Sequence, residues 1–133
     1  MCIFCDIVEG KCPSYKIYED EDTYVFLSIA KDAVGHTLVI PKKHFESTLD
    51  IDNETFMKVM STVKKVANHY VDNCGYTGVN ILNASGVSAG QSVYHLHYHI
   101  IPRKEDDGMD WWPQLEETPY DFEKVCEKLK LTK

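Results

Sequence analysis

The chain has 133 residues, of which 44% are hydrophobic and 26% charged, and its formal net charge is −7. This length and composition fit a single domain, residues 1–133, around one hydrophobic core. The negative charge argues against a nucleic-acid or membrane partner, because both would present a repelling surface, and the longest apolar runs are too short to span a bilayer.

The amino-terminal segment MCIFCDIVEGK lacks a basic flank and a long apolar stretch, so we expect no signal peptide and a cytoplasmic location. Within it, the helical spacing of Phe4, Ile7 and Val8 predicts one short helical turn. The chain has five cysteines, an odd number that argues against a secreted disulfide framework. Cys2 and Cys5 fit a redox pair, half of a zinc site or two small buried residues. Zinc is favoured, because residue 2 leaves no room for the strand that precedes a thioredoxin-like redox pair.

Three strands are expected in the first third of the chain. Residues 14–20 (SYKIYED) and 23–29 (TYVFLSI) read as strands joined by an acidic turn at 19–22, which is typical of a hairpin. Residues 35–41 (GHTLVIP) form a third strand that Pro41 closes.

Residues 53–72 form the clearest predicted helix. Asp52 is placed to cap its start, and Gly75 lies just beyond its end. Its apolar residues fall at steps of three and four: Phe56, Val59, Met60, Val63, Val66, Ala67, Tyr70 and Val71.

The remaining elements complete an α+β domain. Residues 78–83 (GVNILN) predict a short buried strand, followed by a glycine-containing loop and a histidine-rich strand that Pro102 ends. Residues 105–113 are turn-like and exposed in composition. A closing helix is expected to start near Thr118 and Pro119, with Phe122, Val125 and Leu129 on one face. The sum is an antiparallel sheet of about five strands with the long helix packed across one face.

The histidine-rich strand places His95, His97 and His99 at every second position. Alternate side chains of a strand share a face, so the three would lie together, with the residues between them in the core. Neighbours on one face are roughly 7 Å apart, whereas zinc bonds histidine nitrogen at about 2.0–2.1 Å. Three histidines of a straight strand would therefore be strained around one ion, which indicates that they divide two tasks. The alternative is three polar residues on a solvated face.

The segment AGQSVYHLHYHIIPR, residues 89–103, resembles the signature of the histidine triad (HIT) family of nucleotidyl hydrolases and transferases. CIFCDI, IYEDEDTYVFLSI, GHTLVIPKKH and a later Trp-Pro match further blocks of that family in order, so the resemblance covers most of the chain. The cysteine pair resembles the bacterial-type branch that carries zinc. The resemblance implies the HIT fold and a two-fold homodimer with a continuous sheet, for which the helix 53–72 and Tyr70 are interface candidates.

The resemblance implies a division of the histidines. By position, the zinc ligands are Cys2, Cys5, His44 and His95. Four nitrogen and sulfur ligands close a tetrahedral shell and leave no position for water, which describes a structural Zn²⁺ site.

His97 is then the expected catalytic nucleophile, attacking the α-phosphorus of a nucleotide to form a covalent nucleotidyl-histidine that water releases. One ring nitrogen must present a lone pair, so the other must donate to a fixed acceptor, often a backbone carbonyl. His99 resembles the family's histidine at the phosphate or leaving group, and His36 the one that supports the nucleophile. Both could instead be buried histidines with a structural role, whose ring nitrogens are hydrogen-bonded within the core.

The resemblance also implies a nucleotide-binding site. Gly90 would let the backbone approach the phosphate, Gln91 and Ser92 would donate to it, and Asn83 would lie near the phosphate or ribose. Ser28 stands where many members have an aspartate that accepts both ribose hydroxyls, so we expect weaker ribose binding. The base would lie among apolar residues that could equally be plain core: Ile3, Phe4, Phe26 and Ile29.

The expected function is hydrolysis or transfer at the α-phosphate of purine nucleotide derivatives, namely dinucleoside polyphosphates, nucleoside phosphoramidates or adenylyl conjugates. One alternative is a nucleotide-binding interaction module with slow or incidental hydrolysis. Another is a small metal-dependent barrel of the cupin kind, which would leave Cys2 and Cys5 without a use and would be all-β. Trp111, Trp112 and Pro113 are expected to reach toward a partner subunit's active site.

Overall fold

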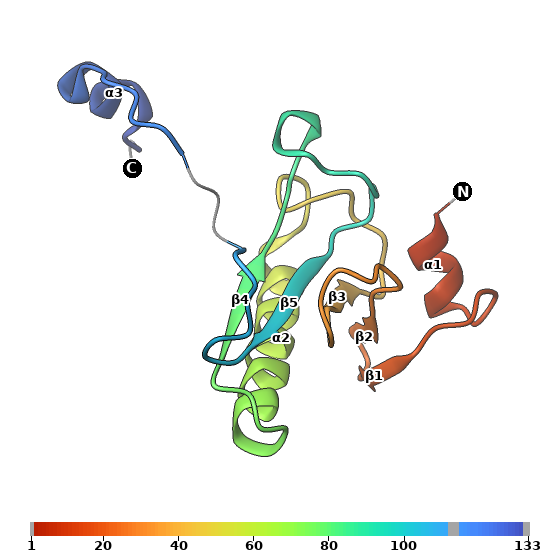
Figure 1. The fold of residues 1–133 in the computed structure, drawn as a ribbon. Helices are drawn as coiled ribbons and strands as arrows, with labels where there is room; N and C mark the ends of the chain where they lie inside the picture. Colours follow the sequence, from red (N-terminus) through yellow and green to blue (C-terminus); the bar gives the residue numbers. More distant parts are fainter. Residues whose placement is uncertain (1, 112–114, 132–133) are drawn as a thin grey trace.

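The computed structural model describes residues 2–111 and 115–131, and it contains a five-stranded sheet with a long helix against it (Figure 1). The strand order is β1-β2-β3-β5-β4, and each neighbouring pair is antiparallel. The predicted α+β class is confirmed, and an all-β barrel is excluded. The elements are α1 (Ile3–Val8), β1 (Lys16–Glu19), β2 (Thr23–Leu27), β3 (Thr37–Pro41), α2 (Asn53–Asn73), β4 (Gly78–Leu82), the 3₁₀ turn η1 (Val87–Ala89), β5 (Tyr98–Arg103) and α3 (Phe122–Leu129).

Helix α2 covers one face of the sheet. It begins where predicted, because the Asp52 carboxylate accepts a hydrogen bond from the Thr55 N–H at 2.9 Å. Tyr70, an interface candidate, is only 7% exposed, and its hydroxyl lies 2.7 Å from that of Thr37, so it belongs to the core of its own chain. The apolar stripe of the helix and the sheet together bury Val25, Val39, Val59, Val63, Val66, Tyr70, Leu96, Tyr98 and Ile100.

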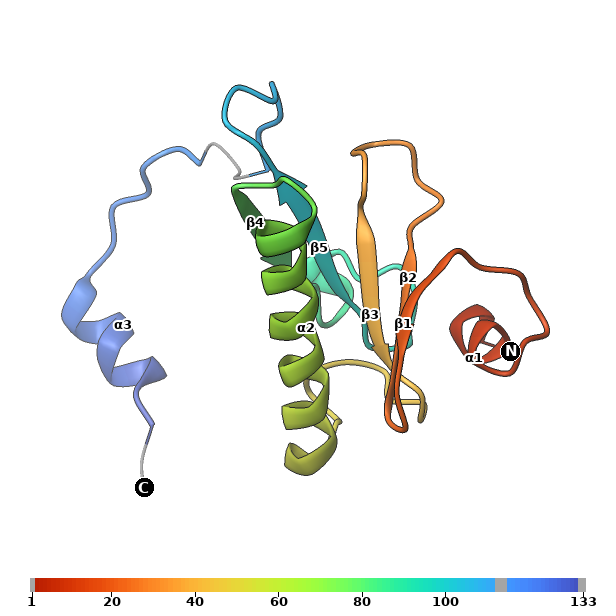
Figure 2. The same cartoon turned by 90° about the horizontal axis from the view of Figure 1, so that it is seen from below.

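Helix α1 packs against the opposite face of the sheet, so that the two helices flank it (Figure 2). The Cys2 side chain caps α1 by accepting from the Cys5 N–H. The apolar residues on this side are Phe4, Ile7, Tyr24, Phe26, Leu38 and Ile40. His95 and His97 pack against Phe4 of this second, smaller cluster.

Two strand predictions are corrected. Strand β5 begins at Tyr98 and runs through Pro102 to Arg103, so Pro102 does not end it. Pro102 lies beyond Ile100, the last residue paired with β3, so its missing N–H removes no bond to that strand. Strand β4 is half-buried rather than buried, with Ile81 45% exposed, because it lies at the edge of the sheet.

Gly35, directly before β3, has a left-handed φ of +83°. A Cβ atom at this position would lie 3.0 Å from Pro102 Cγ. Both facts favour glycine at this turn, which delivers His36 to the start of β3.

The closing helix is also corrected. α3 begins at Phe122 rather than near Pro119, because the Asp121 carboxylate caps it by accepting from the Lys124 N–H. The helix stands apart from the sheet (Figure 1), and Phe122 and Leu129 are each 70% exposed. None of the helices within residues 2–111 and 115–131 combines the length and apolarity needed to cross a bilayer.

Candidate active site and metal centre

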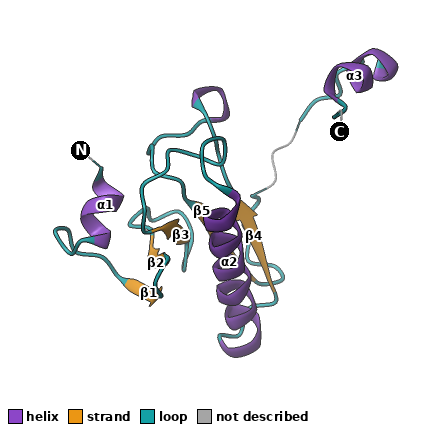
Figure 3. Ribbon diagram, turned by 180° about the vertical axis from the view of Figure 1, so that it is seen from behind, coloured by secondary structure: helices purple, strands orange, loops and turns teal. Residues whose placement is uncertain are grey.

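The three histidines of the motif lie on the sheet face opposite α2. Only His99 belongs to β5; His95 and His97 precede it in a loop, drawn in teal in Figure 3. The chain nevertheless keeps its alternation there. Leu96 donates from its N–H to the Phe45 carbonyl at 2.7 Å and is fully buried against α2, while the rings of His95 and His97 contact Phe4 of α1. The histidines therefore share a face as predicted, although strand β5 is shorter than the predicted strand.

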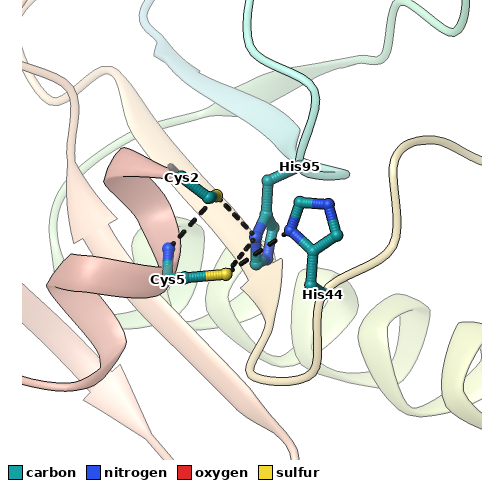
Figure 4. Close-up of side chains that lie close together, drawn as sticks. All are labelled: Cys2, Cys5, His44 and His95. Carbon is teal, nitrogen blue, oxygen red and sulfur yellow. Dashed lines mark hydrogen bonds between the residues drawn. The ribbon is translucent and has the colours of Figure 1, made fainter.

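Four potential metal ligands converge at the amino-terminal end of α1 (Figure 4). The ligand atoms of Cys2, Cys5, His44 and His95 all lie within 4.8 Å of one another. Cys2 Sγ is 3.3 Å from His95 Nδ1, and Cys5 Sγ is 3.4 Å from His44 Nδ1 and 3.5 Å from His95 Nδ1. Tetrahedral Zn–S and Zn–N bonds imply ligand separations of roughly 3.4–3.8 Å, so the donor set fits Zn²⁺.

His95 is oriented for coordination by its second nitrogen. Its Nε2 lies 2.8 Å from the Pro41 carbonyl and must donate to it, which leaves the Nδ1 lone pair facing the two sulfurs. Burial, followed by the rings of His44 and His97, lowers the pKa of His95, which favours the neutral ring that a metal needs. Burial and then the hydrogen bond and charge of Cys2 raise the pKa of Cys5 to about 11. A bound cation would reverse that effect on the thiol.

His97 is held by the main chain of the same segment. Its Nδ1 lies 2.8 Å from the His95 carbonyl and therefore donates to it. The lone pair must then be on Nε2, the arrangement that a nucleophilic imidazole requires. The ring is 8% exposed, and burial in particular lowers its pKa, so it stays neutral at pH 7.

His36 and His99 form a pair beside His97. His36 Nε2 lies 2.8 Å from His99 Nδ1, and the His99 ring centroid is 4.9 Å from that of His97. His36 was expected to support His97, but its hydrogen bond goes to His99. Its other nitrogen, Nδ1, lies 2.9 Å from Asp32 Oδ1. Asp32 was not predicted from the sequence; its position four residues before His36, in a short loop, was the one available signal.

An apolar pocket of about 470 Å³ opens beside His97 and His99, a volume that suits a small organic ligand. The predicted residues Ile3, Phe4, Phe26, Ser28, Ile29 and Ser92 all line it. Seven further lining residues were not predicted: Ile7, Cys12, Pro13, Ser14, Leu27, Leu38 and Val93. The Ser28 hydroxyl accepts a hydrogen bond from the Ala30 N–H at 3.2 Å, so part of its polar capacity is already used.

A larger open groove, about 840 Å³, runs past Cys2, Cys5 and His44. Its walls carry the carboxylates of Asp6, Glu9 and Glu46 with Lys11 as the cation. This acidic lining disfavours an anionic ligand such as a phosphate.

The structure does not bring Asn83, Gly90 and Gln91 to the wall of the apolar pocket. Asn83 instead donates from Nδ2 to the His97 carbonyl at 3.0 Å and so holds the histidine segment. The Gln91 amide bonds the backbone of Gly86, Glu46 and Val93, which fixes the loop. Gly90 takes a left-handed conformation, φ +88°, that closes η1.

Trp111 packs edge-on against His36 of its own chain, with ring centroids 5.9 Å apart. Trp112 and Pro113, which were expected to reach a partner, lie outside the described residues.

Comparisons with known proteins identify a matching family and relatives that cover most of the chain. The family model described as HIT domain matches residues 9–106. An adenosine 5′-monophosphoramidase of Candida albicans (HNT1) is 36% identical over 97% of this chain and 89% of its own length. An adenylylsulfatase of Arabidopsis thaliana (HINT3) is 37% identical over 80% of this chain and 54% of its own.

Solved structures are similar throughout the fold. A member of the HIT family from Bacillus subtilis superposes with a TM-score of 0.84 at 38% identity, covering 99% of this chain and 98% of that one. A Zn-bound histidine triad family protein from Mycobacterium smegmatis has a TM-score of 0.78 at 34% identity, covering 86% and 84%.

Proposed function

The chain belongs to the histidine triad (HIT) family, a family with nucleotide hydrolases among its members, and on that premise we propose that it hydrolyses or transfers at the α-phosphate of purine nucleotide derivatives. The observation that carries this proposal is the fixed tautomer of His97. Its Nδ1–H is held by the His95 carbonyl at 2.8 Å, and the ring lines an apolar pocket of about 470 Å³.

The proposed reaction has two displacements. His97 Nε2 attacks the α-phosphorus, the bond to the leaving group breaks, and a nucleotidyl-histidine forms. His99, at the wall of the same pocket, supplies a proton to the leaving group. Water then attacks the phosphorus, the P–N bond to His97 breaks, and a nucleoside monophosphate is released.

The substrate class follows from the pocket and from the two characterised relatives. The lining of the pocket is mostly apolar, which suits a purine base, and it contains no lysine, arginine or carboxylate. The relatives cleave a phosphoramidate and an adenylylsulfate, as their names state. We therefore propose that the substrates of this chain are nucleoside phosphoramidates, adenylyl conjugates or dinucleoside polyphosphates.

Zn²⁺ bound by Cys2, Cys5, His44 and His95 would be structural, because the four ligands complete its shell. Such an ion would join α1 to the loop after β3 and to the histidine segment. It would thereby set the position of the His95 carbonyl, which holds His97.

We further propose that the chain is one domain throughout, works in the cytoplasm and forms a two-fold homodimer. The open edge of β4, where Ile81 is 45% exposed, is the surface that could continue the sheet into a second copy.

A single-turnover experiment tests the proposed function. The protein is mixed in excess with adenosine 5′-phosphoramidate labelled at phosphorus and quenched over time. We expect a transient covalent adenylyl-protein followed by AMP, and loss of both in His97→Ala. His69→Ala is the matched control, because His69 is an exposed histidine of α2. Binding of the nucleotide without either product would support the alternative, an interaction module, and would overturn the hydrolase.

A further inference from the structure

Asp32, His36 and His99 form a continuous row from the protein surface to the apolar pocket, which we call the carboxylate–imidazole row. The Asp32 side chain is 43% exposed, whereas that of His36 is 7% exposed. The row is joined by contacts of 2.9 Å, from Asp32 Oδ1 to His36 Nδ1, and 2.8 Å, from His36 Nε2 to His99 Nδ1. His99 is the last member and lines the pocket beside His97.

The protonation state of the row determines whether His99 Nε2 presents a lone pair or a hydrogen to the pocket. An ionised Asp32 is only an acceptor, so His36 Nδ1 must carry a hydrogen. When His36 is neutral, its Nε2 accepts from His99 Nδ1–H, and His99 Nε2 presents a lone pair. When one proton is added, His36 becomes a cation that donates at both nitrogens, and His99 Nε2 carries a hydrogen. A single proton therefore converts the pocket end of the row from acceptor to donor.

We propose that Asp32 is a positioning residue that makes the row a reversible proton donor for the leaving group, a role that rests on the proposed function. In the first displacement, His99 Nε2–H passes its proton to the departing amine. The His36 Nε2 proton moves to His99 Nδ1, and His36 becomes neutral. In the second displacement, the attacking water gives a proton to His99 Nε2, and the row regains its starting charge.

The surroundings of the row explain why a carboxylate is needed. Burial, followed by the rings of His97 and His36, lowers the pKa of His99 to about 4, while Asp32 opposes this shift. Desolvation alone would raise the pKa of Asp32, but the hydrogen bond and charge of His36 lower it, so the carboxylate stays ionised. The Trp111 ring beside His36 adds no charge. Asp32, the carboxylate whose charge acts on His99, and the bound substrate phosphate then stabilise a proton on the row.

The experiment compares Asp32→Asn with Asp72→Asn, a change of the same charge at an exposed position of α2. First-step rates are measured in single turnovers, between pH 5 and 9, with two substrates. Adenosine 5′-phosphoramidate needs a proton on its leaving amine, whereas adenosine 5′-(4-nitrophenyl phosphate) releases a stable phenolate. For Asp32→Asn we expect the phosphoramidate rate to fall by about 10-fold or more, with the nitrophenyl rate changed by less than about 2-fold. The pH at which the phosphoramidate rate declines should move lower, because the variant lacks the charge that stabilises the proton.

Equal losses on both substrates with an unmoved pH profile would overturn the role of Asp32, as would wild-type behaviour. A separate readout is ¹⁵N NMR of the imidazoles, where His36 should be protonated at Nδ1 in the wild type and lose that preference in Asp32→Asn. An unchanged tautomer in Asp32→Asn would overturn the inference even if the phosphoramidate rate fell as expected. Absence of any covalent intermediate in the wild type removes the proposed function, whatever the tautomers show.

Discussion

The carbonyl of His95 accepts the Nδ1–H of His97 at 2.8 Å, while the ring of His95 faces Cys2 and Cys5 through Nδ1. One residue therefore serves both parts of the site: its side chain faces the proposed metal and its main chain orients the proposed nucleophile. Movement of the metal centre must move His97, so structural integrity and activity should be linked.

Removal of the metal is the first test of that link. We expect one zinc ion per chain, and we expect Cys5→Ala to lose it. The free energy of unfolding should fall by about 3 kcal/mol or more, because loss of a bound metal is among the mechanisms that give the largest effects of single mutations. Metal content measured by mass spectrometry and urea unfolding check this. Cys126→Ala, an exposed cysteine of α3, should keep both metal and stability. A wild-type protein free of zinc after expression in zinc-containing medium would contradict the assignment.

Ser28→Asp should strengthen ribose binding. The Ser28 hydroxyl already accepts from the Ala30 N–H, so it has one further acceptor site and its own proton to offer the ribose. An aspartate would accept from both ribose hydroxyls, and a hydrogen bond to a charged group contributes about 1.5–3 kcal/mol, so KM for adenosine substrates should fall by about 10-fold. The 2′,3′-dideoxy analogue should show no gain. An unchanged KM for the ribose substrate would show that another group holds the sugar.

Asn83→Ala should lower kcat more than it raises KM. The Asn83 amide donates to the His97 carbonyl at 3.0 Å but does not line the pocket. Its loss should let the histidine segment shift, and small displacements of a reacting group cost up to about 100-fold in rate. Steady-state kinetics beside Asn73→Ala, a distant change at the end of α2, measure the effect. A rise in KM alone would instead place Asn83 at the substrate.

The low pKa of His99 predicts acid lability. In the fold, burial and then the neighbouring rings hold the pKa of His99 at about 4, whereas the ordinary value is 6.5. Below pH 6.5 the unfolded chain binds this proton before the folded chain does, so the contribution is full above pH 6.5 and is lost as the pH falls toward 4.

Urea unfolding at pH 7.5 and pH 5 measures this loss, which for His99 alone should be about 1 kcal/mol after discounting for partial solvent screening. His99→Asn should show a correspondingly smaller difference between the two pH values. An identical difference in the variant would assign the lability to other groups.

The open edge of β4 predicts the oligomeric state. Ile81 is an exposed apolar residue on this edge, and a charge there disfavours pairing with a second strand. We expect a dimer in sedimentation velocity for the wild type and a monomer for Ile81→Lys, with unchanged circular dichroism. Ile17→Lys on β1, at the other edge of the sheet, is the control. A monomeric wild type would remove the homodimer from the proposal.

The sequence alone determined the class of fold and singled out the four potential metal ligands that the structure brings together. The three-and-four spacing of residues 53–72 required a helix with one buried face, and alternation placed Leu96 and His97 on opposite sides of the chain. Local patterns of this kind predict structure well, because burial of one face requires an apolar residue at each turn of a helix or each second position of a strand. They could not give the length of β5, which depends on a neighbouring strand. The start of α3 was a missed local signal, because Asp121 caps it as Asp52 caps α2.

Only the tertiary structure decided how the polar groups pair. Asp32 lies against His36, His36 against His99 rather than His97, and Asn83 against the His97 carbonyl. Each of these bonds joins side chains whose directions are set by turns and by packing on distant elements. Hydrogen bonds act over about 3 Å, so a sequence can supply the donors and acceptors while the fold selects their partners.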